Sequence, residues 1–174
     1  MKLKTMVSRF LLPRFAVSLY GYIKFRSLIS LRSEVELDNL KLGRKNQISS
    51  FCKIKTRRGL LQTGDNVNIA TGCFISTSEE KIIIGNDVLI GPNCTILANN
   101  YRTTDINQPI REQGRITKGT RIGNDVLIGA GTVILDGTII EDGCVISALS
   151  LVSGKIPKNS VVSGNPAKVI FTRR

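Results

Sequence analysis

The side chains of this chain that could do chemistry are four cysteines and a polar segment between residues 99 and 119. The chain has no histidine, so the commonest general base and a common zinc ligand are both absent. Cys52, Cys73 and Cys94 fall at the same place of successive repeats, and no Cys-x-x-Cys pair occurs. We therefore expect these three and Cys144 to be free thiols packed as small core side chains in a reducing compartment, with no metal site.

The polar segment offers amide, phenol and carboxylate groups. Asn99 and Asn100 can position a substrate or donate to a developing oxyanion, but an amide cannot take a proton. A phenol is a weak base at neutral pH, so Tyr101 needs help from its surroundings to act as one. Asp105 is near in sequence and could orient a substrate or accept its proton. The segment therefore predicts acid–base chemistry without the usual imidazole.

A six-residue repeat positions this segment. From Ile84, and again from Ile122, the chain reads Ile-Gly-Asn-Asp-Val-Leu-Ile-Gly. Aliphatic residues and one threonine recur at six-residue steps on either side, at Leu42, Ile48, Ile54, Thr63, Ile69, Ile75, Ile134, Ile140, Ile146 and Val152. Three short strands per coil, with these side chains pointing inward, predict a mainly β triangular prism, which is a parallel β-solenoid. An up-and-down sandwich would instead show alternation of period two.

The spacing of the repeats locates one long insertion. Ile122 and Ile140 are 18 residues apart, which is one coil. Ile96 and Ile122 are 26 residues apart where a single step needs six, so about 20 residues leave the coil at residues 100–119. Long loops on compact scaffolds are usually functional. We therefore expect a solenoid domain over residues 34–174 with a protruding loop at residues 100–119.

Residues 1–33 do not follow the repeat, and they carry seven basic residues and no acid, within a net charge of +12. Apolar spacing predicts two short amphipathic helices there, at about residues 3–11 and 15–23. Such helices either cap the open end of a solenoid or form a basic anchor on an anionic membrane. We expect capping from the second helix and membrane contact from the first.

Charge and hydropathy also bear on location and partners. No apolar stretch is long enough for a signal-peptide core or a membrane span. We therefore expect a cytoplasmic protein, with peripheral attachment to the inner face of the membrane through residues 1–33 as an alternative. Nucleic-acid binding is not expected, because few aromatic residues lie among the basic ones and no recognition motif occurs.

Four stretches of this sequence resemble the hexapeptide-repeat acyltransferases, whose fold is a left-handed parallel β-helix. They are Ile84–Asn93, Ile122–Gly131, Gln108–Gly114 and Val162–Ile170, and the likeness extends over roughly residues 40–170. The sequence is most similar to the sugar and polysaccharide O-acetyltransferases of bacterial surface-glycan synthesis. The resemblance implies acetyl-CoA as the donor, a sugar or polysaccharide precursor as the acceptor, and a homotrimer with active sites between subunits.

The resemblance also implies where acetyl-CoA would lie. An extended pantetheine arm can follow a coil where small corner residues let it approach the backbone. The matching corner positions are Gly129, Ala130, Ser147, Ala148, Ser153 and Gly154. Lys168 matches a basic position that meets the nucleotide phosphates, and Arg173 would add charge there. The alternative is that the small residues only form tight turns.

The catalytic position departs from the family pattern. Members usually carry a histidine right after the hexapeptide that enters the loop, and Tyr101 stands there in this chain. We expect an acetyltransferase that modifies a sugar hydroxyl in cell-surface polysaccharide biosynthesis, with Tyr101 or Asp105 replacing the histidine and Asn99 and Asn100 beside them. One alternative is an N-acetyltransferase on an amino sugar, which needs less help from a base. The other is a non-catalytic protein that binds partners or assembles on membranes.

Overall fold

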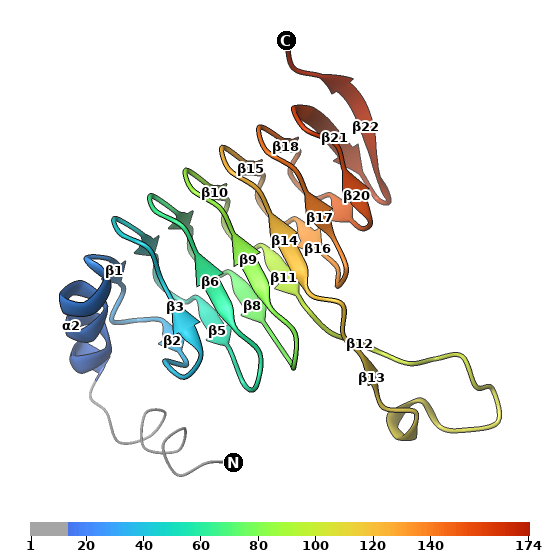
Figure 1. The fold of residues 1–174 in the computed structure, drawn as a ribbon, viewed down its shortest axis with the longest axis horizontal. Helices are drawn as coiled ribbons and strands as arrows, with labels where there is room; N and C mark the ends of the chain where they lie inside the picture. Colours follow the sequence, from blue (N-terminus) through green and yellow to red (C-terminus); the bar gives the residue numbers. More distant parts are fainter. Residues whose placement is uncertain (1–13) are drawn as a thin grey trace.

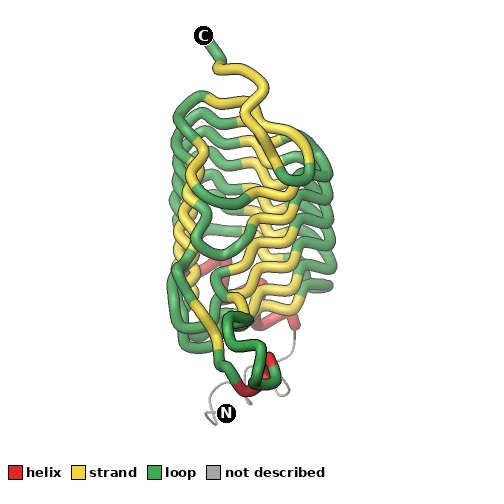
Figure 2. Tube along the Cα trace, turned by 90° about the vertical axis from the view of Figure 1, so that its right-hand side faces the viewer, coloured by secondary structure: helices red, strands yellow, loops and turns green. Residues whose placement is uncertain are grey.

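A computed structural model describes residues 14–174 of the chain as a prism of stacked coils (Figure 1). The first expected helix, at about residues 3–11, lies outside the described residues. Each coil places one short strand in each of three sheets, and strands of successive coils pair in parallel. Figure 2 shows these strands stacked along the prism and joined by turns at its corners. The expected mainly β parallel solenoid is confirmed.

We name the sheets A, B and C in the order in which a coil visits them, and the corners A–B, B–C and C–A. Sheet A contains β1 (Leu28–Ile29), β4 (Gln47–Ile48), β7 (Asn68–Ile69), β10 (Leu89–Ile90), β15 (Leu127–Ile128), β18 (Val145–Ile146), β21 (Ser160–Gly164) and the antiparallel β22 (Ala167–Thr172). Sheet B contains β2 (Glu34–Val35), β5 (Lys53–Lys55), β8 (Phe74–Ser76), β11 (Thr95–Leu97), β16 (Val133–Ile134) and β19 (Leu151–Val152). Sheet C contains β3 (Leu40–Lys41), β6 (Leu61–Thr63), β9 (Ile82–Ile84), β14 (Thr120–Ile122), β17 (Ile139–Ile140) and β20 (Lys155–Ile156).

The core is a continuous stack of aliphatic side chains contributed by all three sheets. Every repeat start predicted to face inward, from Leu42 to Val152, is buried. In sheet B, for example, Ile96 pairs with Ile134, and neither side chain is exposed to solvent. Burying one such isoleucine contributes about 2 kcal/mol. The six-residue spacing therefore specifies the core because it returns an aliphatic side chain to the inside of every face.

The cysteines belong to this core. Cys52, Cys73 and Cys94 stack at the A–B corner of successive coils, where each thiol donates to a backbone carbonyl at distances of 3.1–3.2 Å. All four cysteines are buried and free, as expected. The neighbouring thiols and burial raise the pKa of Cys73, and burial raises the pKa of Cys144. Hydrogen bonding to the Cys73 thiol lowers the pKa of Cys52 and of Cys94 to about 7. All four thiols are buried in the core, so none is placed to attack a substrate.

The repeated Gly-Asn-Asp sequence builds the C–A corner. The side-chain oxygen of Asn86 accepts a hydrogen bond from the backbone N–H of Asp65 at 2.8 Å, one coil earlier. Asn124 does the same for the backbone N–H of Asn86, also at 2.8 Å. A Cβ atom on Gly85 would lie 2.6 Å from the carbonyl oxygen of Gly123, so only glycine fits there. The most conspicuous motif of the sequence is therefore explained by stacking of the coils.

The N-terminal end of the prism is covered by helix α2 (Arg14–Phe25), as Figure 1 shows. A Cβ atom on Gly21 would lie 2.7 Å from Cδ1 of Ile29, so the helix and the first coil approach closely. Val17 and Phe25 pack against the core from the same side of the helix. β1 already pairs with β4, so coil pairing begins at Leu28, earlier than the expected start at residue 34. Within residues 14–174, no helix is long and apolar enough to cross a membrane.

Candidate functional site

The long insertion leaves the prism at the B–C corner, between β11 and β14 (Figure 1). Its two arms pair as antiparallel strands β12 (Asn100–Tyr101) and β13 (Arg115–Ile116). A short 3-10 helix, η1 (Ile110–Glu112), precedes β13 on the returning arm. Apart from Gln113 and a few partly buried residues near its base, the loop is exposed. It is therefore placed to contact a substrate or another subunit.

Tyr101 and Arg115 form a pair on the two arms of the loop. The Arg115 guanidinium donates a hydrogen bond to the Tyr101 hydroxyl at 3.1 Å and lies 5.0 Å from the centroid of its ring. The phenol oxygen thus accepts from Arg115 and keeps its own proton to donate. Tyr101 is 46 % exposed, so that proton is accessible to an incoming group. The sequence alone did not indicate Arg115, because its role depends on the pairing of the two arms.

Asp105 is built into the loop. One carboxylate oxygen accepts from the backbone N–H of Asn107 at 2.9 Å. The side-chain amide of Gln113 bonds the backbone N–H and the carbonyl of Asp105, at 3.1 and 2.6 Å. Its hydrogen bonds are thus to groups of the loop backbone and Gln113 rather than to Tyr101. The geometry gives Asp105 a role in shaping the loop.

The two asparagines lie where the loop departs from the prism. Asn100 uses its side-chain oxygen to accept from the backbone N–H of Tyr101 at 2.9 Å. It is exposed, whereas Asn99 is half-buried next to the end of β11. The structure therefore groups Asn99, Asn100, Tyr101 and Arg115 at the base of the loop.

Asp136 fixes the point where the loop rejoins the coil. Its carboxylate accepts hydrogen bonds from the backbone N–H groups of Lys118 at 3.0 Å and Gly119 at 2.9 Å. The backbone N–H of Gly137 also donates to the carbonyl of Gly119 at 2.8 Å. Sequence analysis did not single out Asp136, since nothing in the repeat pattern marks the residue that stacks beneath the end of an insertion.

Asp136→Ala is expected to loosen the loop, because two backbone donors at its base lose their acceptor. Trypsin cleavage after Arg102, Arg111 or Arg115 should become roughly tenfold faster, as expected when local opening becomes easier. Gel analysis of timed digests measures this rate. Glu141→Gln, which breaks an ion pair with Lys155 away from the loop, is the matched control and should leave cleavage unchanged. Equal rates for both variants would contradict the assigned role of Asp136.

The expected donor residues Gly129, Ala130, Ser147 and Ala148 lie together at the A–B corner of two successive coils. A Cβ atom on Gly129 would lie 2.4 Å from the backbone nitrogen of Ala148, so close stacking alone requires glycine there. Ala148 is exposed, and beside it Leu149 is 78 % exposed at a φ of 59°. A leucine in this left-handed region is strained. This exposed corner has small side chains beside one strained apolar residue.

The other expected donor residues lie elsewhere on the same chain. Ser153 and Gly154 follow β19 at the B–C corner, on the side of the prism from which the loop departs. Lys168 is exposed on β22 at the C-terminal end. Arg173 donates to the carbonyl of Gly143 at 2.7 Å and pairs with Asp125 at 3.8 Å, both at the C–A corner. One chain therefore distributes the expected donor residues over three corners.

Comparison with known proteins agrees with the repeats and the fold. The family model "Bacterial transferase hexapeptide (six repeats)" matches residues 119–154, and "Hexapeptide repeat of succinyl-transferase" matches residues 81–97. The protein named "Probable acetyltransferase Rv3034c" of Mycobacterium tuberculosis is 34 % identical over 146 residues, which are 84 % of this chain and 48 % of that protein. The chain spans about half the length of the curated relatives that it matches.

Solved structures share the fold at low identity. AntD, an N-acyltransferase from Bacillus cereus in complex with dTDP and 3-hydroxybutyryl-CoA, superposes with a TM-score of 0.77 and 20 % identity, over 90 % of this chain and 87 % of that one. A maltose O-acetyltransferase from Clostridium difficile 630 gives a TM-score of 0.64 and 23 % identity, over 98 % and 83 %. The resemblance to the hexapeptide-repeat acyltransferases is thereby confirmed: the chain carries the family repeat and folds as a left-handed parallel β-helix.

Proposed function

We propose that the protein is an acetyl-CoA-dependent acetyltransferase that acetylates a sugar or polysaccharide precursor in cell-surface polysaccharide synthesis. The observation that carries this proposal is the position of the loop. The two transferase-repeat matches, residues 81–97 and 119–154, flank it directly, and its base presents Tyr101 and Arg115. The acetyltransferase name of the mycobacterial relative, and the CoA thioester bound by AntD, support the same donor class.

The donor would lie along the A–B corner. A pantetheine arm can use backbone groups of a coil where the side chains are as small as those of Ala130 and Ala148. Lys168 is exposed and offers its cation to the nucleotide phosphates at the C-terminal end. Arg173 is already bound at the C–A corner by Gly143 and Asp125, so it would contribute charge rather than a direct contact.

The site would be completed by a homotrimer. The loop leaves from the B–C corner, whereas Gly129, Ala130, Ser147 and Ala148 lie at the A–B corner, so a neighbouring subunit would bring its loop to them. Sheet A offers a face for such packing. Its outward side carries an uncharged apolar stripe in register, consisting of Leu89, Leu127, Val145, Val161 and Phe171. Sheet B instead carries the ion pair Glu34–Lys53, and Lys155 of sheet C pairs with Glu141, which follows β17.

The reaction would pass the acetyl group in one displacement. The acceptor atom bonds to the thioester carbonyl carbon, the C–S bond breaks, and CoA leaves as the thiol after taking up the acceptor's proton. Tyr101 would donate a hydrogen bond at the reacting group, and the Asn100 and Asn99 amides would line the approach. Asp105 would hold the loop in shape.

Two acceptors remain in the proposal. A sugar hydroxyl is the expected one, and it requires a base for its proton. An amino sugar is the second candidate, because both candidate bases are already engaged in other contacts. The Tyr101 oxygen accepts from Arg115, and the Asp105 carboxylate binds within the loop. A free amine attacks with its own lone pair and needs little help. A non-catalytic binding protein is the third alternative.

We place the protein in the cytoplasm, because its buried free thiols suit a reducing compartment.

Ala148→Trp is expected to weaken CoA binding at least about tenfold, because an indole would fill the corner along which the pantetheine arm lies. Isothermal titration calorimetry with CoA measures the affinity. Thr71→Trp is the matched control: Thr71 is exposed at the same A–B corner, several coils nearer the N-terminus. Its affinity for CoA should match that of the unmodified protein. Failure of the unmodified protein to bind CoA, or equal loss in both variants, would contradict the proposed donor site.

A further inference from the structure

Helix α2 is apolar on two opposite faces, and only one of them packs on the solenoid. Val17, Gly21 and Phe25 face the first coil. The opposite side carries Phe15, Leu19, Tyr22 and Ile23, which are 62 %, 52 %, 61 % and 72 % exposed. At 100° per residue these four side chains occupy an arc about 100° wide. We call them the outer face of α2; burial in the described protein does not account for them.

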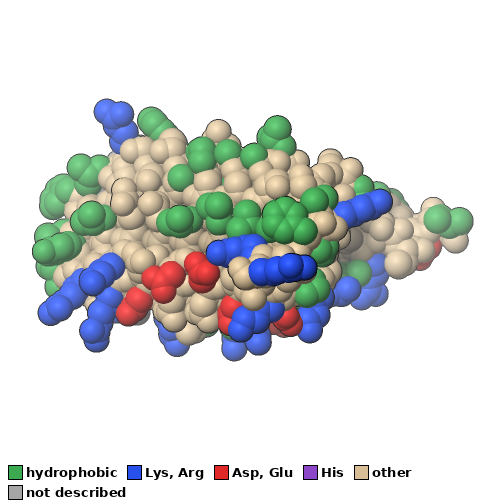
Figure 3. Space-filling model, turned by 90° about the horizontal axis from the view of Figure 1, so that it is seen from above, with side chains coloured by type: hydrophobic (Ala, Val, Ile, Leu, Met, Phe, Trp, Pro, Cys, Tyr) green, Lys and Arg blue, Asp and Glu red, His purple; other side chains and the backbone are tan. Residues whose placement is uncertain are grey.

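The first two coils also carry exposed apolar side chains. Leu28 and Leu31 are 59 % and 51 % exposed. Phe51, at the A–B corner of the second coil, is 63 % exposed and has a φ of 62°, where a bulky residue is strained. Figure 3 shows hydrophobic and basic side chains together at the end of the molecule where α2 lies, at the left of the view. The N-terminal end of the prism is thus an apolar surface edged with positive charge.

Basic groups border this surface. The sequence has no acid before Glu34. Lys24 donates to the Tyr20 hydroxyl at 2.5 Å and lies 4.9 Å from the centre of the Tyr20 ring, so its charge is held at the side of the helix. Arg26 follows the last residue of the helix with a φ of 49° and, together with Arg44, lines a cavity of about 530 Å³.

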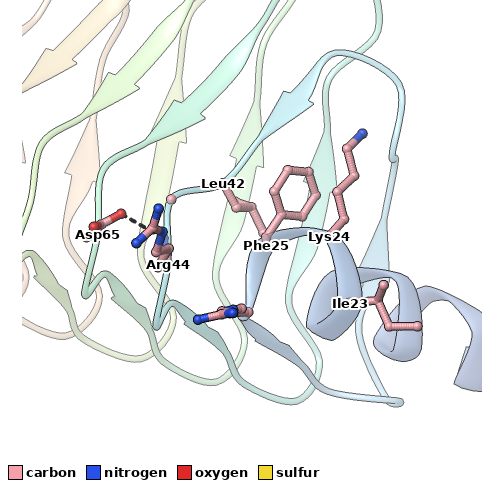
Figure 4. A pocket seen from close by; sticks show the side chains of 8 residues that line it. Ile23, Lys24, Phe25, Leu42, Arg44 and Asp65 are labelled. Atoms are coloured by element: carbon pink, nitrogen blue, oxygen red, sulfur yellow. Dashed lines mark hydrogen bonds between the residues drawn. The ribbon is translucent and has the colours of Figure 1, made fainter.

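The cavity adjoins the outer face. Ile23 belongs to both, and Leu42 and Phe25 supply further apolar lining (Figure 4). Asp65 is the acid in the lining; one of its carboxylate oxygens accepts from the backbone N–H of Arg44 at 2.7 Å. The cavity therefore combines the guanidinium groups of Arg26 and Arg44, the ammonium group of Lys24 and one carboxylate with an apolar wall, directly beside the exposed side chains of α2.

We propose that the outer face of α2 docks on an anionic phospholipid bilayer. A helix with an exposed apolar arc and basic flanks lies in the interface of such a membrane, with its apolar side chains below the headgroups. Arg26 and Arg44 then meet lipid phosphates at the edge of the contact. Since α2 lies at one end of the prism and β22 at the other, the solenoid stands on the membrane by its N-terminal end (Figure 1). This docking is independent of the proposed acetyl transfer.

Vesicle co-sedimentation with the full chain tests the proposal. The protein should bind phosphatidylcholine vesicles that contain phosphatidylglycerol at least about tenfold more tightly than pure phosphatidylcholine vesicles, and less tightly in high salt. Leu19→Ser combined with Ile23→Ser should lower binding to the anionic vesicles at least about tenfold, because two apolar side chains no longer enter the membrane. Both positions are exposed on α2, so circular dichroism should show an unchanged fold.

Ile106→Ser provides the matched control. Ile106 is 94 % exposed on the insertion loop, away from α2, and its replacement should leave vesicle binding unchanged. The proposal is overturned if the unmodified protein does not bind anionic vesicles, or if the α2 variant binds them as well as the control does. Light scattering, which measures molar mass, tests the alternative that a second copy of the chain packs on this face. A fall in molar mass for the α2 variant would assign the outer face to contact between copies of the chain and would also overturn the proposal.

Discussion

Replacement of residues 101–115 by a two-residue Asn-Gly turn is expected to lower acetyl transfer at least about a thousandfold. Asn100 and Ile116 are a pair across the base of the loop, so a tight turn can join them without disturbing the coil. The change removes Tyr101 and Arg115, the groups that we place at the reacting centre. Removal of positioned proton donors and acceptors typically has an effect of this size. Thiol release from acetyl-CoA in the presence of a sugar acceptor measures the rate.

Two further measurements distinguish loss of catalysis from loss of CoA binding and from loss of the fold. CoA binding by calorimetry should persist in the shortened protein, since the A–B corner is far along the coil from the base of the loop. The melting temperature should remain close to that of the unmodified protein, because the residues removed lie outside the aliphatic core. Transfer at the original rate by a folded shortened protein would show that the loop has no part in catalysis.

Ile134→Ala is expected to destabilise the protein by about 3 kcal/mol, the second large effect. Ile134 stacks between Ile96 and Val152 in sheet B, and none of the three side chains is exposed. The smaller side chain leaves a cavity between two coils that cannot close without moving the stack. Differential scanning calorimetry should show a melting temperature lower by roughly 6–12 °C.

Ile139→Ala is the control for this prediction. Ile139 differs from Ile134 in pointing outward from sheet C, where it is 43 % exposed. Its replacement should lower the free energy of unfolding by less than about 1 kcal/mol. Equal destabilisation by the two variants would contradict the division of each strand into one inward and one outward side chain.

The fold was predictable because the repeat reports directly on orientation. An aliphatic residue at each sixth position, such as Ile84, Ile90 and Ile96, can face inward on every side of the prism only if the chain coils with three strands per turn. The same register predicted the buried column of Cys52, Cys73 and Cys94. The six-residue repeat sets both the local strands and the overall coil, so a single sequence was enough to predict the fold.

The candidate site was predictable only in part. Loop residues from Asn99 to Asp105 were expected from the break in the repeat, but the pairing of Tyr101 with Arg115 depends on how the two arms of the loop meet. Asp136 acts by stacking under Lys118 and Gly119, which lie in the preceding coil of the prism. Such contacts join neighbouring coils across an insertion of irregular length, so no fixed sequence spacing predicts them.

The contacts of the C-terminal tail and of α2 were also not predictable from the sequence. Arg173 lies beyond the last repeat, and its contacts with Gly143 and Asp125 follow from the antiparallel return of β22. In α2, apolar spacing indicated a helix but not that its apolar residues divide between a packed face and an exposed one. That division depends on which side Gly21 presents to Ile29.

Release of CoA thiol from acetyl-CoA, followed with matched panels of hydroxyl-bearing and amino sugars, tests the central claim most directly. The proposed function predicts release that depends on the sugar and yields the corresponding acetylated product by mass spectrometry. An O-acetylated product would identify the hydroxyl as acceptor, and an N-acetylated product would identify the amine. No release with any sugar, together with no heat of CoA binding, would contradict the assignment of this chain as an acetyltransferase.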